Sequence, residues 1–326
     1  MSGSLDSLKQ HADMIAAASP AFYNVSGPGD VTPASPIGDP DVISAMRSTG
    51  VPVIPAFSES LSTQAMTNVL SEPSTRDLLV QTIAKVATDN SYDGVDLDFE
   101  SMAVTTDVAA ASHLAPLYVQ FCQELAQTLH RHHQQLAVTV MLRTSDSGSW
   151  RPTLSPQVYD YRGLGRVADL LRVMVYDVHW PSGAPGGIAP IDWDRSVLAY
   201  TLARVPANKV ELGVPTYSRD WGKPGTNAVD RTWSDTMNVM KQYDASPQWS
   251  GANMEPYFTY TDADGVSHIV WYSDAASIAA RVRLACSMGL AGVVVWALYG
   301  AEDPETWSAV RSALPANGRC TPGYGR

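Results

Sequence analysis

The stretch YDGVDLDFE, residues 92–100, places four carboxyl groups inside what otherwise looks like a buried strand. Successive side chains of a strand point to opposite faces, so we expect Asp96, Asp98 and Glu100 on one face. The large apolar side chains between them fall on the other face, which can pack under a helix. Carboxylates are costly to bury unless they share protons or find hydrogen-bond donors. We therefore expect this acidic face to line a functional cavity.

Two other interpretations of this stretch are a solvated edge strand and a calcium loop. A solvated edge strand gives no reason for side chains as large as Val95, Leu97 and Phe99. A calcium loop favours glycine and small polar residues between its ligands, whereas these spacers favour strands. Both interpretations explain the stretch less well than a cavity does.

The composition is that of a globular protein with a large core. The chain has 326 residues, of which 45% are hydrophobic and 17% charged. A net charge of −11 argues against nucleic acid or an anionic membrane surface as partner, and no apolar run approaches the roughly 18 residues of a membrane span. Nine Trp and 14 Tyr against five Phe form an amphipathic ring set that suits a sugar-binding cleft. The expected partner is a polysaccharide, and the expected state is a monomer.

No metal or other cofactor is expected. Cys122, Cys286 and Cys320 form neither a disulfide framework nor a zinc motif. Cys122 and Cys286 lie in helical patterns and are interpreted as small core residues, and whether Cys320 in the Pro/Gly-rich tail forms a disulfide stays open. The histidine-rich run 130–133 closes a helix, where cations suit the helix dipole, and it lacks nearby Cys or acidic ligands for a metal.

Apolar runs alternate with helical patterns along the chain, and such repeats indicate a parallel sheet, either doubly wound or closed into a barrel. Seven runs are expected to be strands: 21–26, 51–58, 93–100, 136–143, 169–177, 209–217 and 291–300. No G-x-G-x-x-G fingerprint follows an early strand, which weakens a nucleotide-binding interpretation. Polar or aromatic residues gather at the strands' C-terminal ends, which favours a (β/α)8 barrel; they are Glu100, Arg143, Tyr176, Asp177, Tyr217 and Trp296.

Residues 218–273 interrupt this rhythm and are expected to form a small α+β insertion before the last strand. The stretch PYFTYTDADGVSHIVWYSD predicts a hairpin that turns at Asp264-Gly265. Asp262 and Asp264 could also suggest calcium ligands, but Asp-Gly between two alternating arms is typical of a turn.

Seven strands are one fewer than a closed barrel of this type needs. The chain opens on a helical pattern with an expected cap near Ser4, and no signal peptide stands before it. We therefore expect the first strand to be lacking, as in a truncated reading frame. Strands 21–26 and 291–298 would then have open edges, which predicts association or weak activity.

The acidic stretch resembles the D-G-x-D-x-D-x-E signature of glycoside hydrolase family 18, the chitinase family. VMVYD (173–177) is similar to the family's M-x-Y-D strand, and GVPTYSRDW (213–221) to its G-x-P-x-Y-G-R-x-W strand end, with Ser218 in place of glycine. VVVWAL (293–298) supplies a tryptophan near the last strand. The stretches AASPAFYNV and VWYSDAASIAARVRLACSMGLAGVVVWAL resemble the bacterial branch of spore-germination and cortex-lytic hydrolases. The resemblance covers residues 4–312.

This resemblance implies an α/β fold, a TIM (β/α)8-type barrel lacking its first strand, with the α+β insertion before the last strand. It implies one catalytic domain over residues 1–312 that includes the insertion 218–273, followed by a Pro/Gly-rich tail over 313–326. The family carries its acidic motif on the fourth strand, whereas here the motif is on the third, which agrees with a lacking strand.

The resemblance also assigns roles. Glu100 would protonate the glycosidic oxygen, Asp98 would raise its pKa and hold the substrate's acetamido N–H, Asp96 would buffer Asp98, and Tyr176 would donate to the acetamido oxygen. The implied substrate-binding residues are Asp93, Met174, Asp177, Tyr217, Arg219 and Trp296. Packing is the alternative role for the binding residues on the later strands, above all for Met174 and Trp296.

The implied function is hydrolysis of β-linked N-acetylglucosamine polymers by a retaining mechanism in which the substrate's acetamido group is the nucleophile. The alternative is a non-catalytic chitinase-like carbohydrate-binding protein, and the presence of Glu100 favours the enzyme. The bacterial branch favours peptidoglycan over chitin, while endo or exo cleavage stays open. A secreted or cell-envelope location is expected, with the signal segment outside this chain, and a cytoplasmic location stays open.

Overall fold

The computed structural model of the chain describes residues 2–34, 40–316, 318 and 320. They belong to two compact units. The first, here called the acid-strand unit, comprises Ile15–Val173 and Ala199–Val210. The second, here called the insertion unit, comprises Met1–Met14, Met174–Leu198 and Glu211–Arg326. Whether the two units act as one catalytic domain stays a prediction.

The acid-strand unit is built on a sheet whose strands are ordered β6-β5-β4-β3-β1-β2. The strands are β1 (Ala21–Gly27), β2 (Asp30–Pro33), β3 (Ala56–Glu59), β4 (Gly94–Asp98), β5 (Gln135–Met141) and β6 (Leu170–Met174). Strand β4 lies between β3 and β5 and is parallel to both. The acidic strand is therefore an inner strand, and the edge-strand interpretation is excluded.

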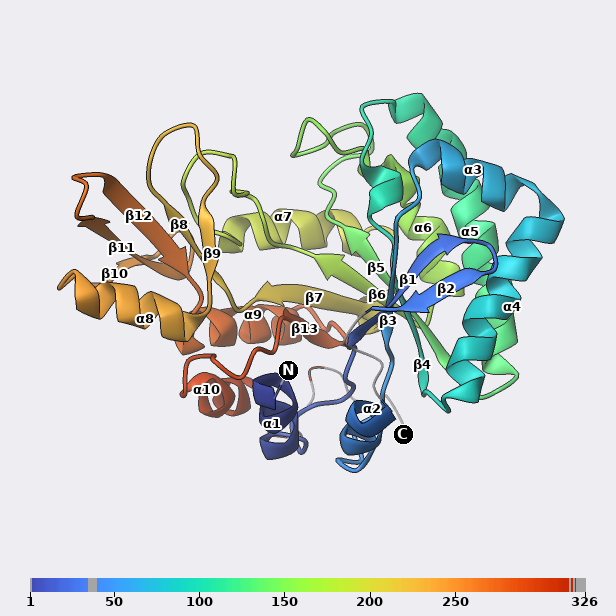
Figure 1. Cartoon of the computed structure of the whole chain (residues 1–326), viewed down its shortest axis with the longest axis horizontal. Coiled ribbons are helices and arrows are strands. Elements are labelled where there is room, and N and C mark those ends of the chain that lie inside the picture. Colours follow the sequence, from blue (N-terminus) through green and yellow to red (C-terminus); the bar gives the residue numbers. More distant parts are fainter. Residues whose placement is uncertain (1, 35–39, 317, 319, 321–326) are drawn as a thin grey trace. The chain divides into compact units, whose positions relative to one another are not determined.

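Helices cover this sheet, as Figure 1 shows for α3, α4 and α5. The helices of the unit are α2 (Pro40–Arg47), α3 (Thr63–Ser71), α4 (Pro73–Asp89), α5 (Val108–His130) and α6 (Tyr161–Val167). The apolar side of α5 faces the core, because Leu114, Tyr118 and Phe121 are buried. Glu72 separates α3 from α4, and its backbone angles are extended because Pro73 follows it.

Two strand predictions need correction. Strand β3 begins at Ala56 and not at Val51, because Pro52 and Pro55 have no N–H to donate to a sheet. The edge beside residues 21–26 is not open, because β2 pairs with β1 in an antiparallel hairpin. The short strand β2 is not among the seven strands expected from the sequence.

The insertion unit contains a parallel pair and a separate antiparallel sheet. Strand β13 (Gly292–Trp296) is parallel to β7 (Val210–Pro215), which is its sheet neighbour among the described residues. The antiparallel sheet has the order β10-β11-β12-β8-β9. Its strands are β8 (Ser218–Trp221), β9 (Val229–Arg231), β10 (Gln248–Ser250), β11 (Glu255–Thr261) and β12 (Ser267–Tyr272). Figure 1 shows α8 (Trp233–Gln242) beside this sheet, which confirms the predicted α+β insertion.

The predicted hairpin is also confirmed. Strands β11 and β12 pair in antiparallel register, and Gly265 adopts the positive φ of +80° that the turn requires. Asp262 accepts hydrogen bonds from the backbone N–H groups of Asp264 and Val266 at 3.0 and 2.8 Å. Asp262 is therefore a turn residue of the kind that caps its own loop.

The remaining helices of this unit are α1 (Ser2–Gln10), α9 (Ala275–Ser287) and α10 (Thr306–Ala313), while α7 (Ile191–Leu202) belongs in part to each unit. The predicted cap near Ser4 is wrong, because Ser4 lies inside α1. The interpretation of Cys286 as a core residue is also wrong, because Cys286 forms a disulfide with Cys320. No helix in the described part of the chain is long and apolar enough to cross a membrane.

Candidate active site

The acidic face of β4 changes from buried to exposed along the strand. Asp96 is only 4% exposed, Asp98 is half-buried, and Glu100 is exposed just beyond the strand's C-terminal end. The side chains on the opposite face are fully buried, and the ring of Phe99 packs against those of Tyr118 and Phe121. The alternation predicted from the sequence is therefore confirmed.

Asp96 is held in place by three donors. Ser19 Oγ and Thr139 Oγ1 each donate to its carboxylate at 2.9 Å, and Arg172 Nη1 donates at 2.6 Å. Arg172 is buried as well, so its guanidinium compensates the Asp96 charge inside the unit. This carboxylate is fixed and is not available to attack a substrate.

Asp98 has a different environment. Its Oδ1 is buried and has no hydrogen-bond partner among the described residues. Burial is the largest cause that raises the pKa of Asp98 well above its usual value, and the nearby charges of Glu100 and Asp96 add to it. Glu59 raises this pKa further, while Arg172 lowers it without reversing the direction. The protonated form of Asp98 is therefore favoured.

Glu59 is a fourth acid of this site that sequence reasoning missed. It ends β3, is buried, and accepts hydrogen bonds from the backbone N–H groups of Met102 and Leu61 at 2.7 and 3.1 Å. Burial raises the pKa of Glu59 despite these donors. Its position at the C-terminal end of a strand, the feature by which Glu100 is selected, would have identified Glu59 from the sequence.

Tyr159 fixes the backbone beside Glu100. Its buried hydroxyl donates to the carbonyl oxygen of Phe99 at 2.6 Å. Glu100 then begins the short 3-10 helix Ser101–Ala103, which turns the chain sharply at the strand's end. This geometry holds the Glu100 side chain at the exposed end of the row of acids.

Asp93 lies at the other end of β4, and the structure separates it from the carboxylates near Glu100. Its Oδ2 accepts a hydrogen bond from the Val53 N–H at 2.7 Å. Gly94 follows it because a Cβ there would come within 2.4 Å of the Gln135 carbonyl oxygen. This contact gives the Asp-Gly pair of the motif a structural role, and the assignment of Asp93 to substrate binding stays a prediction.

The insertion unit brings three other predicted residues together. Asp177 Oδ1 accepts hydrogen bonds from the Tyr217 hydroxyl and, at 2.8 Å, from Arg219 Nη1. Arg219 is 3% exposed and also donates to Asp230 at 2.9 Å. The Tyr176 ring meets the Tyr217 ring edge-on, with the centroids 6.3 Å apart. The hydrogen bonds of Tyr217 and Arg219 therefore fix the orientation of the Asp177 carboxylate.

Trp296 ends β13 with 44% of its surface exposed, so the alternative that it is a core residue is wrong. Its carbonyl oxygen accepts from the Thr216 N–H at 2.9 Å, which fixes the strand end that carries the indole. Met174 is half-buried at the end of β6. An exposed, anchored indole can serve as a platform for a sugar ring.

The described part of the chain holds no group of three or more His, Cys, Asp or Glu side chains arranged to bind a metal. In the histidine-rich run, His130 Nε2 lies 2.9 Å from Asp169 Oδ2. That contact gives His130 a partner at the end of α5.

Comparison with known proteins agrees with this geometry. The profile of Glycosyl hydrolases family 18 matches residues 6–301, so the chain belongs to that family and is a glycosidase. Its fold is accordingly the family's TIM-type α/β barrel.

Three relatives illustrate the match. The glycosylase YvbX of Bacillus subtilis is 32% identical over 260 residues, which cover 78% of this chain and 70% of that protein. The cortical fragment-lytic enzyme of B. subtilis is 29% identical over 245 residues, which cover 73% of this chain and 54% of that protein. The crystal structure of a chitinase from Chromobacterium violaceum superposes with a TM-score of 0.85 at 30% identity and 96% coverage of both chains. The chain thus spans little more than half of the cortical fragment-lytic enzyme.

The raised pKa of Asp98 predicts a pH dependence of stability. A group whose pKa is raised by folding stabilises the folded state below its unfolded pKa, near 3.8, and this contribution is lost as the pH rises through the folded pKa. Asp98→Asn removes the titration, so we expect the melting temperature of the variant to gain on the wild type from about pH 4 upward. Thermal unfolding of both proteins across this range measures the gap. Asp77→Asn, at an exposed site on α4, is the control. A melting temperature of Asp98→Asn that falls relative to that of the wild type as the pH rises would contradict the assignment.

Proposed function

We propose that this glycosidase hydrolyses β-linked N-acetylglucosamine polymers by a retaining mechanism in which the substrate's own acetamido group is the nucleophile. The observation that carries the proposal is that the three acids along β4 differ in environment. Asp96 is held by hydrogen bonds, Asp98 favours its protonated form, and Glu100 is exposed. Each acid has a different environment and therefore a different role.

Glu100 is the proposed general acid. It is exposed, and the Tyr159 hydrogen bond to Phe99 fixes the backbone that carries it. In the first step it protonates the glycosidic oxygen as the bond from that oxygen to the sugar's C1 breaks. In the second step its carboxylate takes a proton from the water that attacks C1, which restores the acid.

An ordinary retaining glycosidase needs a second, ionised carboxylate as nucleophile. Asp96 does not suit that role because three donors occupy it in a buried position. Asp98 does not suit it either, because burial and neighbouring acids favour its protonated form. The proposed nucleophile is therefore the acetamido oxygen, which closes onto C1 to give a cyclic oxazolinium ion.

Asp98 would orient this nucleophile. Its carboxyl group would take a hydrogen bond from the acetamido N–H, which directs the acetamido oxygen toward C1 and stabilises the positive charge of the cyclic ion. Asp96, with its charge compensated by Arg172, limits the build-up of negative charge beside it.

The insertion unit would supply substrate contacts. We assign Tyr176 to the acetamido oxygen, Asp177 to a sugar hydroxyl and Trp296 to the face of the sugar ring. Tyr217 and Arg219, being buried and bonded to Asp177, would position that residue. The half-buried Met174 would shape the pocket.

Peptidoglycan is the favoured substrate over chitin. Support comes from a relative named as a cortical fragment-lytic enzyme, although the C. violaceum structure is named a chitinase. A secreted or cell-envelope location goes with this substrate. The Cys286–Cys320 disulfide supports that location, because disulfides persist mainly in oxidising compartments.

Replacing Glu100 by Gln keeps the side chain's shape and removes its proton. We expect hydrolysis of N-acetylglucosamine oligomers to fall by at least about a hundredfold, with binding of the oligomers retained. Turnover and calorimetric binding measure the two effects. The matched control is Glu72→Gln, at an exposed site before α4. Turnover of Glu100→Gln at the wild-type rate would show that another group is the acid.

The acetamido mechanism makes a second prediction. A thiazoline mimic of the cyclised sugar should inhibit competitively, and plain β-glucan should not be cleaved, because glucose units lack the acetamido group. Inhibition constants and product analysis measure both effects. Efficient cleavage of β-glucan, or indifference to the thiazoline, would rule out this mechanism and leave the fold unaffected.

A further inference from the structure

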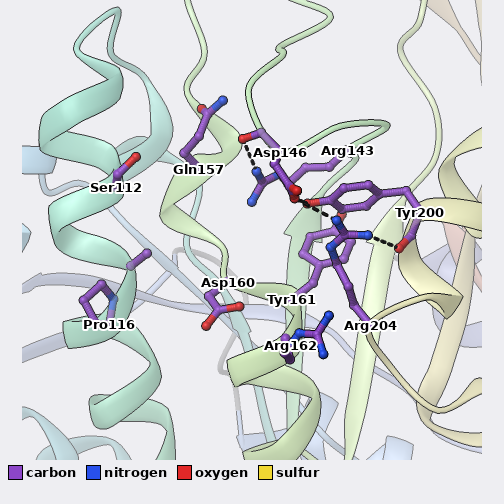
Figure 2. Close-up of a pocket in the computed structure, with 11 residues that line it drawn as sticks. Ser112, Pro116, Arg143, Asp146, Gln157, Asp160, Tyr161, Arg162, Tyr200 and Arg204 are labelled. Carbon is purple, nitrogen blue, oxygen red and sulfur yellow. Dashed lines mark hydrogen bonds and ion pairs between the residues drawn. The ribbon is translucent and has the colours of Figure 1, made fainter.

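A polar cavity of about 400 Å³ lies in the acid-strand unit, beside the segment that follows β5 (Figure 2). It is bounded by the first half of α5, the start of α6 and the last turn of α7, and it has no role in the mechanism above. Three arginines and two aspartates contribute to its lining: Arg143, Arg162, Arg204, Asp146 and Asp160.

The charge of Asp146 is already matched within this cavity. Its Oδ1 accepts hydrogen bonds from the Tyr200 hydroxyl and from Arg204 Nη2, each at 2.8 Å (Figure 2). These partners lower the pKa of Asp146, so it stays ionised. The Arg204 guanidinium also lies 3.6 Å from the centre of the Tyr200 ring, which further fixes this side of the cavity.

Arg143 differs from Arg204 because its donors go to carbonyl oxygens. Nη1 donates to the Tyr159 carbonyl at 3.0 Å and Nη2 to the Asp146 carbonyl at 2.7 Å. The residue is only 7% exposed, and its charge acts on the Asp146 carboxylate without a hydrogen bond to it. Asp146 is shared with Arg204, so the two guanidinium groups together leave positive charge that attracts an anion.

Two buried polar atoms of the lining have no hydrogen-bond partner in the described part of the chain. One is the donor Arg143 Nε, and the other is the acceptor Gln157 Oε1. Both atoms are closed to solvent, so a ligand pairs them only when the two side chains turn toward the cavity. Leaving them unpaired is costly, which favours that turn. The complementary ligand carries a carboxylate for Nε–H and an amide N–H for Oε1. A peptide provides both groups.

The cavity is connected to the acidic strand through one residue. The Tyr159 carbonyl accepts from Arg143, while the Tyr159 hydroxyl donates to Phe99, the neighbour of Glu100. An extended peptide of four residues reaches about 13 Å, which is longer than the one tyrosine side chain that makes this connection. A peptide attached to a glycan bound near Glu100 is therefore the substituent that we expect to meet the cavity.

We propose that this cavity binds a carboxylate-bearing peptide substituent of the glycan substrate, an inference that rests on the proposed function. The exposed rim carries Arg162, near the half-buried Asp160, so both signs of charge are offered to such a peptide. Chitin has neither carboxylates nor peptides. The cavity therefore favours peptidoglycan strands that keep their peptides.

The test compares kcat/KM on peptidoglycan strands that keep their peptides with kcat/KM on the same strands after an amidase has removed them. We expect the wild type to prefer the peptide-bearing strands by about tenfold, as one charge-assisted contact gives. Arg162→Gln should lower this ratio about fivefold, and Arg143→Lys, which removes the Nε donor, should lower it at least as much. Free N-acetyl-alanyl-isoglutamate should inhibit cleavage of the peptide-bearing strands only.

The matched control is Arg166→Gln, an exposed arginine one turn further along α6 and outside the cavity lining, which should keep the wild-type ratio. Melting temperatures show whether each variant is folded. If Arg143→Lys does not fold, the Arg162→Gln variant still tests the inference. Equal cleavage of both strands by the wild type would overturn the inference and leave the proposed function standing. Cleavage of neither strand, nor of chitin oligomers, would overturn both.

Discussion

The buried ion pair between Arg172 and Asp96 is the interaction on which the rest of the site depends. Several carboxyl groups share one face of an inner strand, and their mutual repulsion and desolvation would oppose folding without a compensating cation. Arg172 supplies that cation from β6 at 2.6 Å, and two hydroxyl groups complete the shell around Asp96. Removing one partner of such a buried pair typically costs about 3–5 kcal/mol.

Because Arg172 compensates the charge of Asp96, the environments of Asp98 and Glu100 can differ from that of Asp96. Asp98 has a buried oxygen without a partner, and its raised pKa follows from burial and from its acidic neighbours. Glu100 is exposed beyond the strand. Over five residues the acids along this strand thus differ in role, from the structural charge of Asp96 to the reactive acid Glu100. Proteins commonly lose stability in this way at functional sites.

Much of this arrangement can be predicted from the sequence, because strand alternation determines which side chains share a face. The period of two in residues 93–100 identified the acidic face, and the seven barrel-type strands and the insertion hairpin followed from apolar runs and turn residues. Arg172 could have been found in the same way, since it shares a strand face with Met174 and is a charge inside an apolar run.

Other features depend on contacts that no local pattern encodes. The short strand β2 is stabilised by its pairing with β1, and the Cys286–Cys320 disulfide joins residues 34 positions apart. Asp93 belongs to the acidic motif by sequence, but its carboxylate binds the backbone at the far end of β4. A motif can therefore combine structural and reactive positions, and only the tertiary contacts separate them.

The account's central claim is that Asp98 keeps its proton above the usual range because burial and the neighbouring acids disfavour its charge. The most direct measurement is a pH titration of the Asp carboxyl carbons by ¹³C NMR in the wild type and in Asp98→Asn. Burial also raises the pKa of Asp194 and of Asp274, so the account predicts that, among the wild-type carboxyls that titrate above the ordinary value of 3.8, one is missing from the variant. If every carboxyl that titrates above that value in the wild type is still present in Asp98→Asn, the claim is contradicted.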